Sequence, residues 1–269
     1  MISVTSAQLD AWLAAFIYPL ARILAMLAAA PVFNNTGMPR QIRLVFGIAI
    51  SLAIVPALPP IETIPPGSWH GIAVLGQQIL IGAIFGLTLR IMFTAVDIAG
   101  EIIGLQMGLS FASFFDPRNS AQTSVMSSFL GLIMTLLFLA MNGHLLMLSV
   151  LAESFQLLPI STTAFAAPGF SALLAWSAVM FATGLMLALP LITALLIANI
   201  SLGVLARIAP QLNIFAVGFP VTIVTGYAML LFSLPHFGGV LQHLYDQGFD
   251  ALAAVLQAGG ALNPNPPAP

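Results

Sequence analysis

Three charged side chains and one amide fall on a single stretch of helix-forming sequence and are the residues best placed for chemistry. Arg90, Asp97 and Glu101 are followed by Gln106. In an α-helix, which turns by about 100° per residue, the three charges lie within about 20° of a common line. A charge that faces lipid costs several kcal/mol, so we expect this stripe to be buried against protein or to face water. It would suit ion coupling in a transporter or contact with a translocated substrate.

Glycines give the same stretch a second interpretation. Gly82 and Gly86 are four residues apart, and Gly100, Gly104 and Gly108 repeat that spacing. Small residues four apart let apolar helices approach closely, and the last two glycines project onto the charged face. In this interpretation the face is a packing surface on which the arginine neutralises a carboxylate. Packing is favoured, and the pathway interpretation stays open.

Other chemistry is not indicated. The chain has no lysine, so a P-loop of the usual form is impossible, and it has no nucleophile-elbow or H-E-x-x-H motif. Cysteine is absent, and the four histidines are scattered at His70, His144, His236 and His243. We therefore expect no enzyme activity, no cofactor and no metal site.

Composition indicates the solvent. Of the 269 residues, 60% are hydrophobic and 5% are charged, and the net charge is −2; the mean hydropathy is +1.07. Soluble domains carry about 25% charged residues, so this chain could not cover its surface in water. It is predicted to be an all-α, polytopic helical membrane protein without a basic patch for nucleic acid.

About six apolar helices, joined in hairpins, are expected in the membrane. A span needs about 20 apolar residues. The candidate stretches are residues 11–33, 44–61, 72–96, 125–151, 172–199 and 212–235. Residues 240–258 form an amphipathic pattern, and the proline-rich tail, residues 260–269, is predicted to be disordered.

A segment rich in phenylalanine follows the last glycine of the stripe. "LSFASFFDPRNSAQTS" contains helix-breaking residues but also Phe111, Phe114 and Phe115, which precede Asp116 and Pro117. Irregular chain at membrane depth persists only where protein buries it or where it lines a cavity. Either the loop is anchored on neighbouring helices or it is a movable apolar seal inside a pore. The residues leave both alternatives open.

A polar hairpin tip lies further along the chain. "ARIAPQLN" contains Arg207, Pro210 and Gln211 between two apolar stretches. Arginines follow alternate spans, which places this tip on the cytoplasmic side by the positive-inside rule. Its role is either to set topology or to meet a cytoplasmic partner or incoming cargo.

Four long motifs resemble the FliR family of the type III secretion export apparatus. They are "WLAAFIYPLARILAMLAAAPVF", "GEIIGLQMGLSFASFFDP", "MNGHLLMLSVLAESFQLLPI" and "LPLITALLIANISLGVLARIAPQLNIFAVGFP". The resemblance runs in order from about residue 5 to residue 250. The glycine-rich and hairpin motifs look more flagellar than injectisome-like.

The resemblance implies a subunit of the flagellar protein export gate. Members of the family assemble with FliP and FliQ, in a FliPQR complex, beside FlhB and with FlhA assisting. Unfolded flagellar export substrates pass through this channel in the bacterial inner membrane, within the flagellar basal body. The family fold implies one integral-membrane domain over residues 1–259, with a FliP-like portion to about residue 170 and a FliQ-like hairpin with the amphipathic helix at 171–258. Its apolar faces would pack on partner subunits as well as on membrane lipid.

The resemblance also implies roles for the residues of the glycine-rich motif. The loop that plugs the closed channel in the family corresponds to about residues 104–122. Met107 would join the three phenylalanines in the apolar seal, Asp116 and Pro117 would start the return, and Glu101 with the glycine face would seat the helix.

Two functions compete with this interpretation. One is the homologous subunit of an injectisome. The other, from a different class, is a proton-coupled secondary transporter of small solutes, in which the charged stripe would be the coupling site. A transporter of that kind predicts an internal repeat, and we find none in the sequence.

Overall fold

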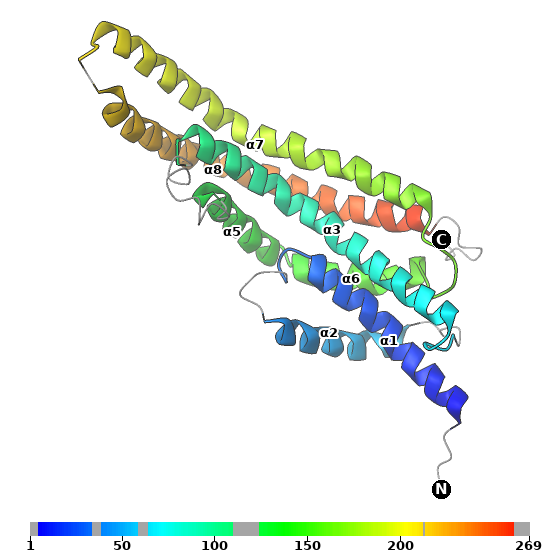
Figure 1. Ribbon diagram of the computed structural model, residues 1–269. Helices are drawn as coiled ribbons and strands as arrows, with labels where there is room; N and C mark the ends of the chain where they lie inside the picture. The colour runs from blue at the N-terminus through cyan, green and yellow to red at the C-terminus, as the bar shows by residue number, and fades with distance from the viewer. Residues whose placement is uncertain (1–4, 34–38, 59–63, 110–123, 212, 261–269) are drawn as a thin grey trace. The chain divides into compact units, whose positions relative to one another are not determined.

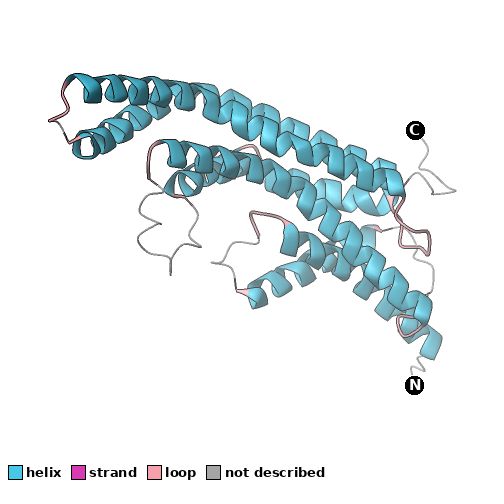
Figure 2. Ribbon diagram, turned by 45° about the horizontal axis from the view of Figure 1, so that its top comes forward, coloured by secondary structure: helices cyan, strands magenta, loops and turns pink. Residues whose placement is uncertain are grey.

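The computed structural model describes residues 5–33, 39–58, 64–109, 124–211 and 213–260, and all regular structure in these ranges is helical (Figures 1 and 2). In chain order the helices are α1 (Ser6–Ala29), α2 (Arg40–Ile54), the short 3-10 helix η1 (Val55–Ala57), α3 (Trp69–Gln106), α5 (Val125–Ala140), α6 (Gly143–Leu157), α7 (Ala167–Ile208) and α8 (Ile214–Gly259). The predicted all-α class is confirmed.

Local sequence explains where the first helices begin. The Thr5 side chain accepts a hydrogen bond from the Gln8 backbone N–H at 3.3 Å, and the Gln8 side chain accepts one from the Thr5 N–H at 3.1 Å. This reciprocal capping box starts α1. Ser68 caps the start of α3 with a single bond, in which its hydroxyl oxygen accepts the Gly71 N–H at 3.0 Å.

Two compact units divide the helices. Unit 1 contains residues 1–91, 141–177 and 247–269, and unit 2 contains residues 92–140 and 178–246. The long helices α3, α7 and α8 are therefore each divided between the two units. The division expected from the family resemblance, near residue 170, is of a different kind and stays a prediction.

Candidate membrane spans are fewer than the six expected. In the described residues, four helices are long and apolar enough to cross a bilayer, namely α1, α3, α7 and most of α8. The bent pair α5 and α6 would make a fifth. The 15-residue α2 is shorter than the length that a span needs. The separate span predicted at 44–61 is not among these candidates, and its last residues, 59–61, lie outside the described residues.

Two helix boundaries also differ from the prediction. Residues 125–151, expected as one span, bend by 66° between α5 and α6. Asn142 adopts the left-handed conformation there, with φ of 57°, which asparagine tolerates better than most residues. In contrast, the stretches 212–235 and 240–258 join into the 46-residue α8, which continues through Pro235. A proline removes one helical hydrogen bond, and the buried residues on either side, including Leu230 and Leu241, hold the helix together.

Candidate functional site

The end of α3 is a tightly specified helix terminus. Gly108 has φ of 81°, in the left-handed region that glycine adopts without strain. Its N–H donates to the Leu105 carbonyl at 3.0 Å, and the Leu109 N–H donates to the Gly104 carbonyl at 3.0 Å. This pair of bonds is a Schellman motif, which ends a helix and satisfies two of its last carbonyls. Gly108 therefore terminates the helix here, a role different from the packing predicted for it.

Met107, the residue before this glycine, is fully buried against α8 within unit 2. Its side chain lies across Gly226, where an added Cβ would lie 2.6 Å from Met107 Cγ. Its carbonyl accepts a hydrogen bond from the Thr222 hydroxyl at 3.2 Å. Both side chain and backbone of Met107 are thus held by one face of α8.

The chain returns to the same place at the start of α5. A Cβ added at Gly104 would clash with the Ser124 hydroxyl, and one added at Gly100 would clash with the Ser127 backbone. Ser124 is the first described residue after residue 109. Leu109 and Ser124, which flank residues 110–123 in the sequence, therefore both lie beside Gly104 of α3. The predicted seal residues in that interval, Phe111, Phe114, Phe115, Asp116 and Pro117, lie outside the described residues.

The predicted polar stripe is not buried by the chain itself. Arg90, Asp97 and Glu101 are exposed, and Gln106 is half-buried. Asp97 accepts a hydrogen bond from the Ser127 hydroxyl at 3.4 Å within unit 2. The helices of the described chain cover the glycines of this region and leave the charged edge exposed, so the burial of this stripe against protein stays a prediction.

The first pair of glycines packs against α1 within unit 1. A Cβ added at Gly82 would clash with the Arg22 backbone carbonyl, and one added at Gly86 would lie 2.5 Å from the Ala29 Cβ. Both glycines are buried. Since backbone cannot move aside as a flexible side chain can, these positions admit no larger residue without separating the two helices.

A buried arginine in unit 1 was missed by the sequence analysis. Arg22 is fully buried in the middle of α1. Its Nε donates to Gln78 Oε1 at 2.8 Å, and its terminal nitrogens donate to the Ser154 carbonyl at 2.9 Å and the Leu158 carbonyl at 2.7 Å. The guanidinium carbon lies 4.2 Å from the centroid of the Phe155 ring. An arginine inside an apolar helix is by itself a signal of a special role, and that signal could have found it.

These partners explain how the charge is tolerated. Ser154 lies in the last turn of α6 and Leu158 follows that helix directly, and carbonyls at the C-terminal end of a helix carry partial negative charge. The ring face of Phe155 adds an attraction for the cation. Arg22 therefore joins α1, α3 and α6, and we assign it a structural role.

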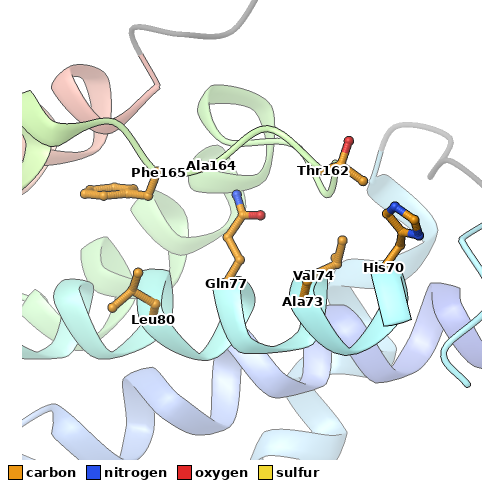
Figure 3. Close-up of a pocket in the computed structure, with 8 residues that line it drawn as sticks. All are labelled: His70, Ala73, Val74, Gln77, Leu80, Thr162, Ala164 and Phe165. Carbon is orange, nitrogen blue, oxygen red and sulfur yellow. The ribbon is translucent and has the colours of Figure 1, made fainter. Parts of the chain in front are cut away.

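Hollows occur on the described surface of each unit. One, of about 330 Å³, lies in unit 1 beside the Gln77 side chain, which points to the Thr162–Phe165 loop (Figure 3). The Gln77 amide nitrogen donates a hydrogen bond to the Thr163 carbonyl, so this nitrogen already has a partner within the chain. The second, of about 630 Å³, is an apolar groove in unit 2 between the start of α5 and α8. No group of three or more metal-ligating side chains occurs in the described ranges.

The predicted hairpin tip lies between α7 and α8. Arg207 is in the last turn of α7, and Pro210 and Gln211 follow the helix; all three are exposed. A basic residue in the last turn favours the helix end electrostatically. The cytoplasmic location of the tip stays a prediction.

These features define a class. The chain is a polytopic helical membrane protein with several long apolar helices, one of which, α3, ends at a left-handed glycine. The sequence matches the family described as bacterial export proteins, family 1, over residues 13–248. The chain belongs to this family.

Relatives of the chain are named flagellar biosynthetic protein FliR. The protein of Pectobacterium carotovorum subsp. carotovorum is 44% identical over 256 residues, which cover 95% of this chain and 98% of the relative. That of Escherichia coli K12 is 41% identical with the same coverage. That of Bacillus subtilis strain 168 is 29% identical over 252 residues, or 91% of this chain and 96% of the relative. The chain is a membrane-embedded component of the flagellar export apparatus.

Proposed function

We propose that the chain is a subunit of the flagellar type III export gate and forms part of the channel through which unfolded flagellar subunits cross the bacterial inner membrane. Three observations support the proposal. They are the apolar surface of α7 and α8, the positions of Leu109 and Ser124 beside Gly104, and the relationship to FliR proteins.

The length of α7 is the main observation that supports assembly with partner subunits. The helix has 42 residues, so it is about 63 Å long at 1.5 Å per residue. Large apolar side chains are exposed from Phe170, near its start, to Ile208, at its end. The hydrocarbon core is about 30 Å thick, and a helix tilted by about 40° uses about 39 Å to cross it. About 24 Å of apolar helix then remains outside the lipid and needs a protein cover.

The cover that fits this surface is another apolar helix. The described part of α8 is similarly long and mostly exposed, with Val224, Leu231 and Phe232 on its open surface. We propose that FliP-type and FliQ-type subunits supply these helices, with FlhB-type and FlhA-type proteins as further partners. The exposed charges Asp97 and Glu101 are then covered in the assembly, where partner groups satisfy them.

The channel role centres on residues 110–123. We propose that Phe111, Phe114 and Phe115, together with the buried Met107, form the apolar seal of the closed channel, and that Asp116 with Pro117 begins the return. The fixed positions of Leu109 and Ser124 support this assignment, because a seal must be anchored at both ends. An apolar constriction blocks water and ions by dewetting.

Native mass tests the assembly. The tagged chain is purified in mild detergent from the membranes of its own host and weighed by native mass spectrometry. A large particle containing two other small, very hydrophobic subunits is expected. A monomer or homodimer that is stable alone would refute the proposal and favour the transporter.

Ion leakage tests the seal. Deletion of residues 111–115 is expected to raise ion flux through the assembled gate in proteoliposomes, with the particle mass reduced only by the deleted residues. Unchanged flux through an intact particle would refute the role of the phenylalanines without touching the assembly.

A further inference from the structure

We propose that the hollow of unit 1, between α3 and the Thr162–Phe165 loop, binds one phospholipid molecule. The hollow has a volume of about 330 Å³. The phosphate would lie at its polar end and one acyl chain at its apolar end, with the second chain left in the bilayer. The proposal follows from the membrane class of the chain and does not depend on the export function.

Polarity changes in one direction along the hollow (Figure 3). His70 and Thr162 lie at one end, and Leu80 and Phe165 lie at the other. His70 is in the first turn of α3. Leu80 is ten residues further along the helix, which is about 15 Å at 1.5 Å per residue. Since half of the hydrocarbon core is also about 15 Å thick, the hollow is about as long as one leaflet is deep.

The helices α1 and α3, both candidate membrane spans, run in the same direction through unit 1. An added Cβ at Gly82 would lie 2.9 Å from the Ala25 Cβ, and one at Gly86 would lie 2.5 Å from the Ala29 Cβ. Each of these pairs is 57 residues apart in the sequence. Residues with this separation therefore lie at about the same height along the two helices.

Two tryptophans with the same separation, Trp12 and Trp69, indicate the depth of the polar end. Their side chains are 64% and 80% exposed, respectively. Tryptophan is enriched at the membrane–water interface, where its ring lies at the level of the lipid headgroups. His70 follows Trp69 directly in the sequence. The polar end of the hollow is therefore at headgroup depth, and the apolar end is among the acyl chains.

The polar end offers neutral hydrogen-bond donors to a phosphate. The His70 imidazole carries at least one N–H and the Thr162 hydroxyl carries one O–H, and both side chains are exposed. The loops at this end, residues 64–68 and 158–166, contain no arginine, and the chain contains no lysine. We therefore expect recognition of the phosphate that phospholipids share, without a preference for headgroups of net negative charge.

The loop that forms the upper wall of the hollow is held at two points. In the middle, the Gln77 amide nitrogen donates a hydrogen bond to the Thr163 carbonyl and so ties the loop to α3. At the apolar end Phe165 is buried, and the Ala166 N–H donates to the Gly259 carbonyl at 2.9 Å. The hollow is therefore preformed, and a lipid enters it without the cost of ordering the loop.

Lipid binding is measured on the full-length chain purified from its host, together with the subunits that copurify. The particle is stripped of lipid in detergent, titrated with phosphatidylethanolamine and weighed by native mass spectrometry. Ala73→Trp fills the hollow, which Ala73 lines, and is expected to reduce the bound lipid by one molecule per copy of this chain. Ile72→Trp is the matched control, because Ile72 is 54% exposed and lies outside the lining.

Two smaller changes test the phosphate contacts and decide the outcome if Ala73→Trp does not fold. Thr162→Val removes the hydroxyl, and His70→Phe removes the imidazole N–H. Each is expected to weaken lipid binding about tenfold, which is the effect of one hydrogen bond to a charged group. Thr163→Val is the control, because Gln77 bonds to the backbone carbonyl of Thr163 and the Thr163 side chain lies outside the lining.

The remaining arms distinguish the occupants. Phosphatidylglycerol is expected to bind about as tightly as phosphatidylethanolamine, and inorganic phosphate is expected to leave the lipid bound. A photo-crosslinking amino acid in place of Leu80 is expected to label lipid. Equal lipid counts in the Ala73→Trp and Ile72→Trp particles would overturn the proposal. Displacement of the lipid by inorganic phosphate, or labelling of detergent or another subunit from position 80, would overturn it as well.

Discussion

Replacing Arg22 by methionine should strongly destabilise the protein. The substitution removes donors from Gln78 Oε1 at 2.8 Å and from the Leu158 carbonyl at 2.7 Å. The Ser154 carbonyl is less affected, because it also accepts the Leu158 N–H at 2.9 Å. An unsatisfied buried acceptor costs about 1–3 kcal/mol, so two of them cost about 4 kcal/mol.

Thermal stability measures this cost. For a chain of this size about 1 kcal/mol corresponds to about 2–4 °C, so the midpoint should fall by about 10 °C in Arg22→Met. The assay is the fraction of full-length protein that stays monodisperse in detergent after heating. Arg22→Lys keeps the charge but not the fork that reaches several acceptors, so we expect it to lose about half as much.

A second substitution tests whether unpaired groups are the cause. Gln78 is fully buried, and its Nε2 has no hydrogen-bond partner among the described residues. Without Arg22 the whole amide is unsatisfied, so adding Gln78→Leu to Arg22→Met should recover about half of the loss. The reasoning is refuted if Arg22→Met melts within about 2 °C of the parent protein, or if Gln78→Leu lowers both backgrounds equally.

Three further predictions concern single positions. Gly82→Val should cost about 2 kcal/mol or more, because its side chain meets the α1 backbone, whereas Gly76→Val in open space should be nearly neutral; thermal melts compare them. Trp176→Phe removes the 2.9 Å bond from Nε1 to the Thr88 carbonyl and should cost about 1 kcal/mol in the same assay. Glu101→Gln should leave export of flagellar subunits within about twofold of normal if its carboxylate is not a coupling group, and a loss of about 10²-fold or more would instead support proton coupling.

Composition and periodicity were sufficient for the class and for most of the helices. The apolar runs that became α1, α3 and α7 are long, and their ends carry recognisable breaks, such as the proline after Arg207. The separation of α5 from α6 was not predicted, because a single left-handed Asn142 in an apolar run gives little warning. The continuity of α8 through Pro235 was also not predicted, because a proline usually breaks a helix, whereas here the helix continues through it.

The site was predicted unevenly. Glycine spacing indicated close packing, and the structure places Gly82, Gly86, Gly100 and Gly104 against neighbouring chain. The partners of those glycines could not be read from one sequence, since they belong to α1 and to the start of α5, on either side of α3 in the chain. Angular position on a helix also did not reveal that the charged edge is left uncovered by the chain itself.

The lengths of α7 and α8 limit how long a newly made copy can remain without its partner subunits. A newly made copy carries apolar helix that neither water nor a single bilayer accommodates, so its survival depends on how soon it meets its partners. We expect surplus copies to be short-lived and to be degraded by membrane proteases. The number of finished gates would then follow the rate at which the scarcest subunit is synthesised.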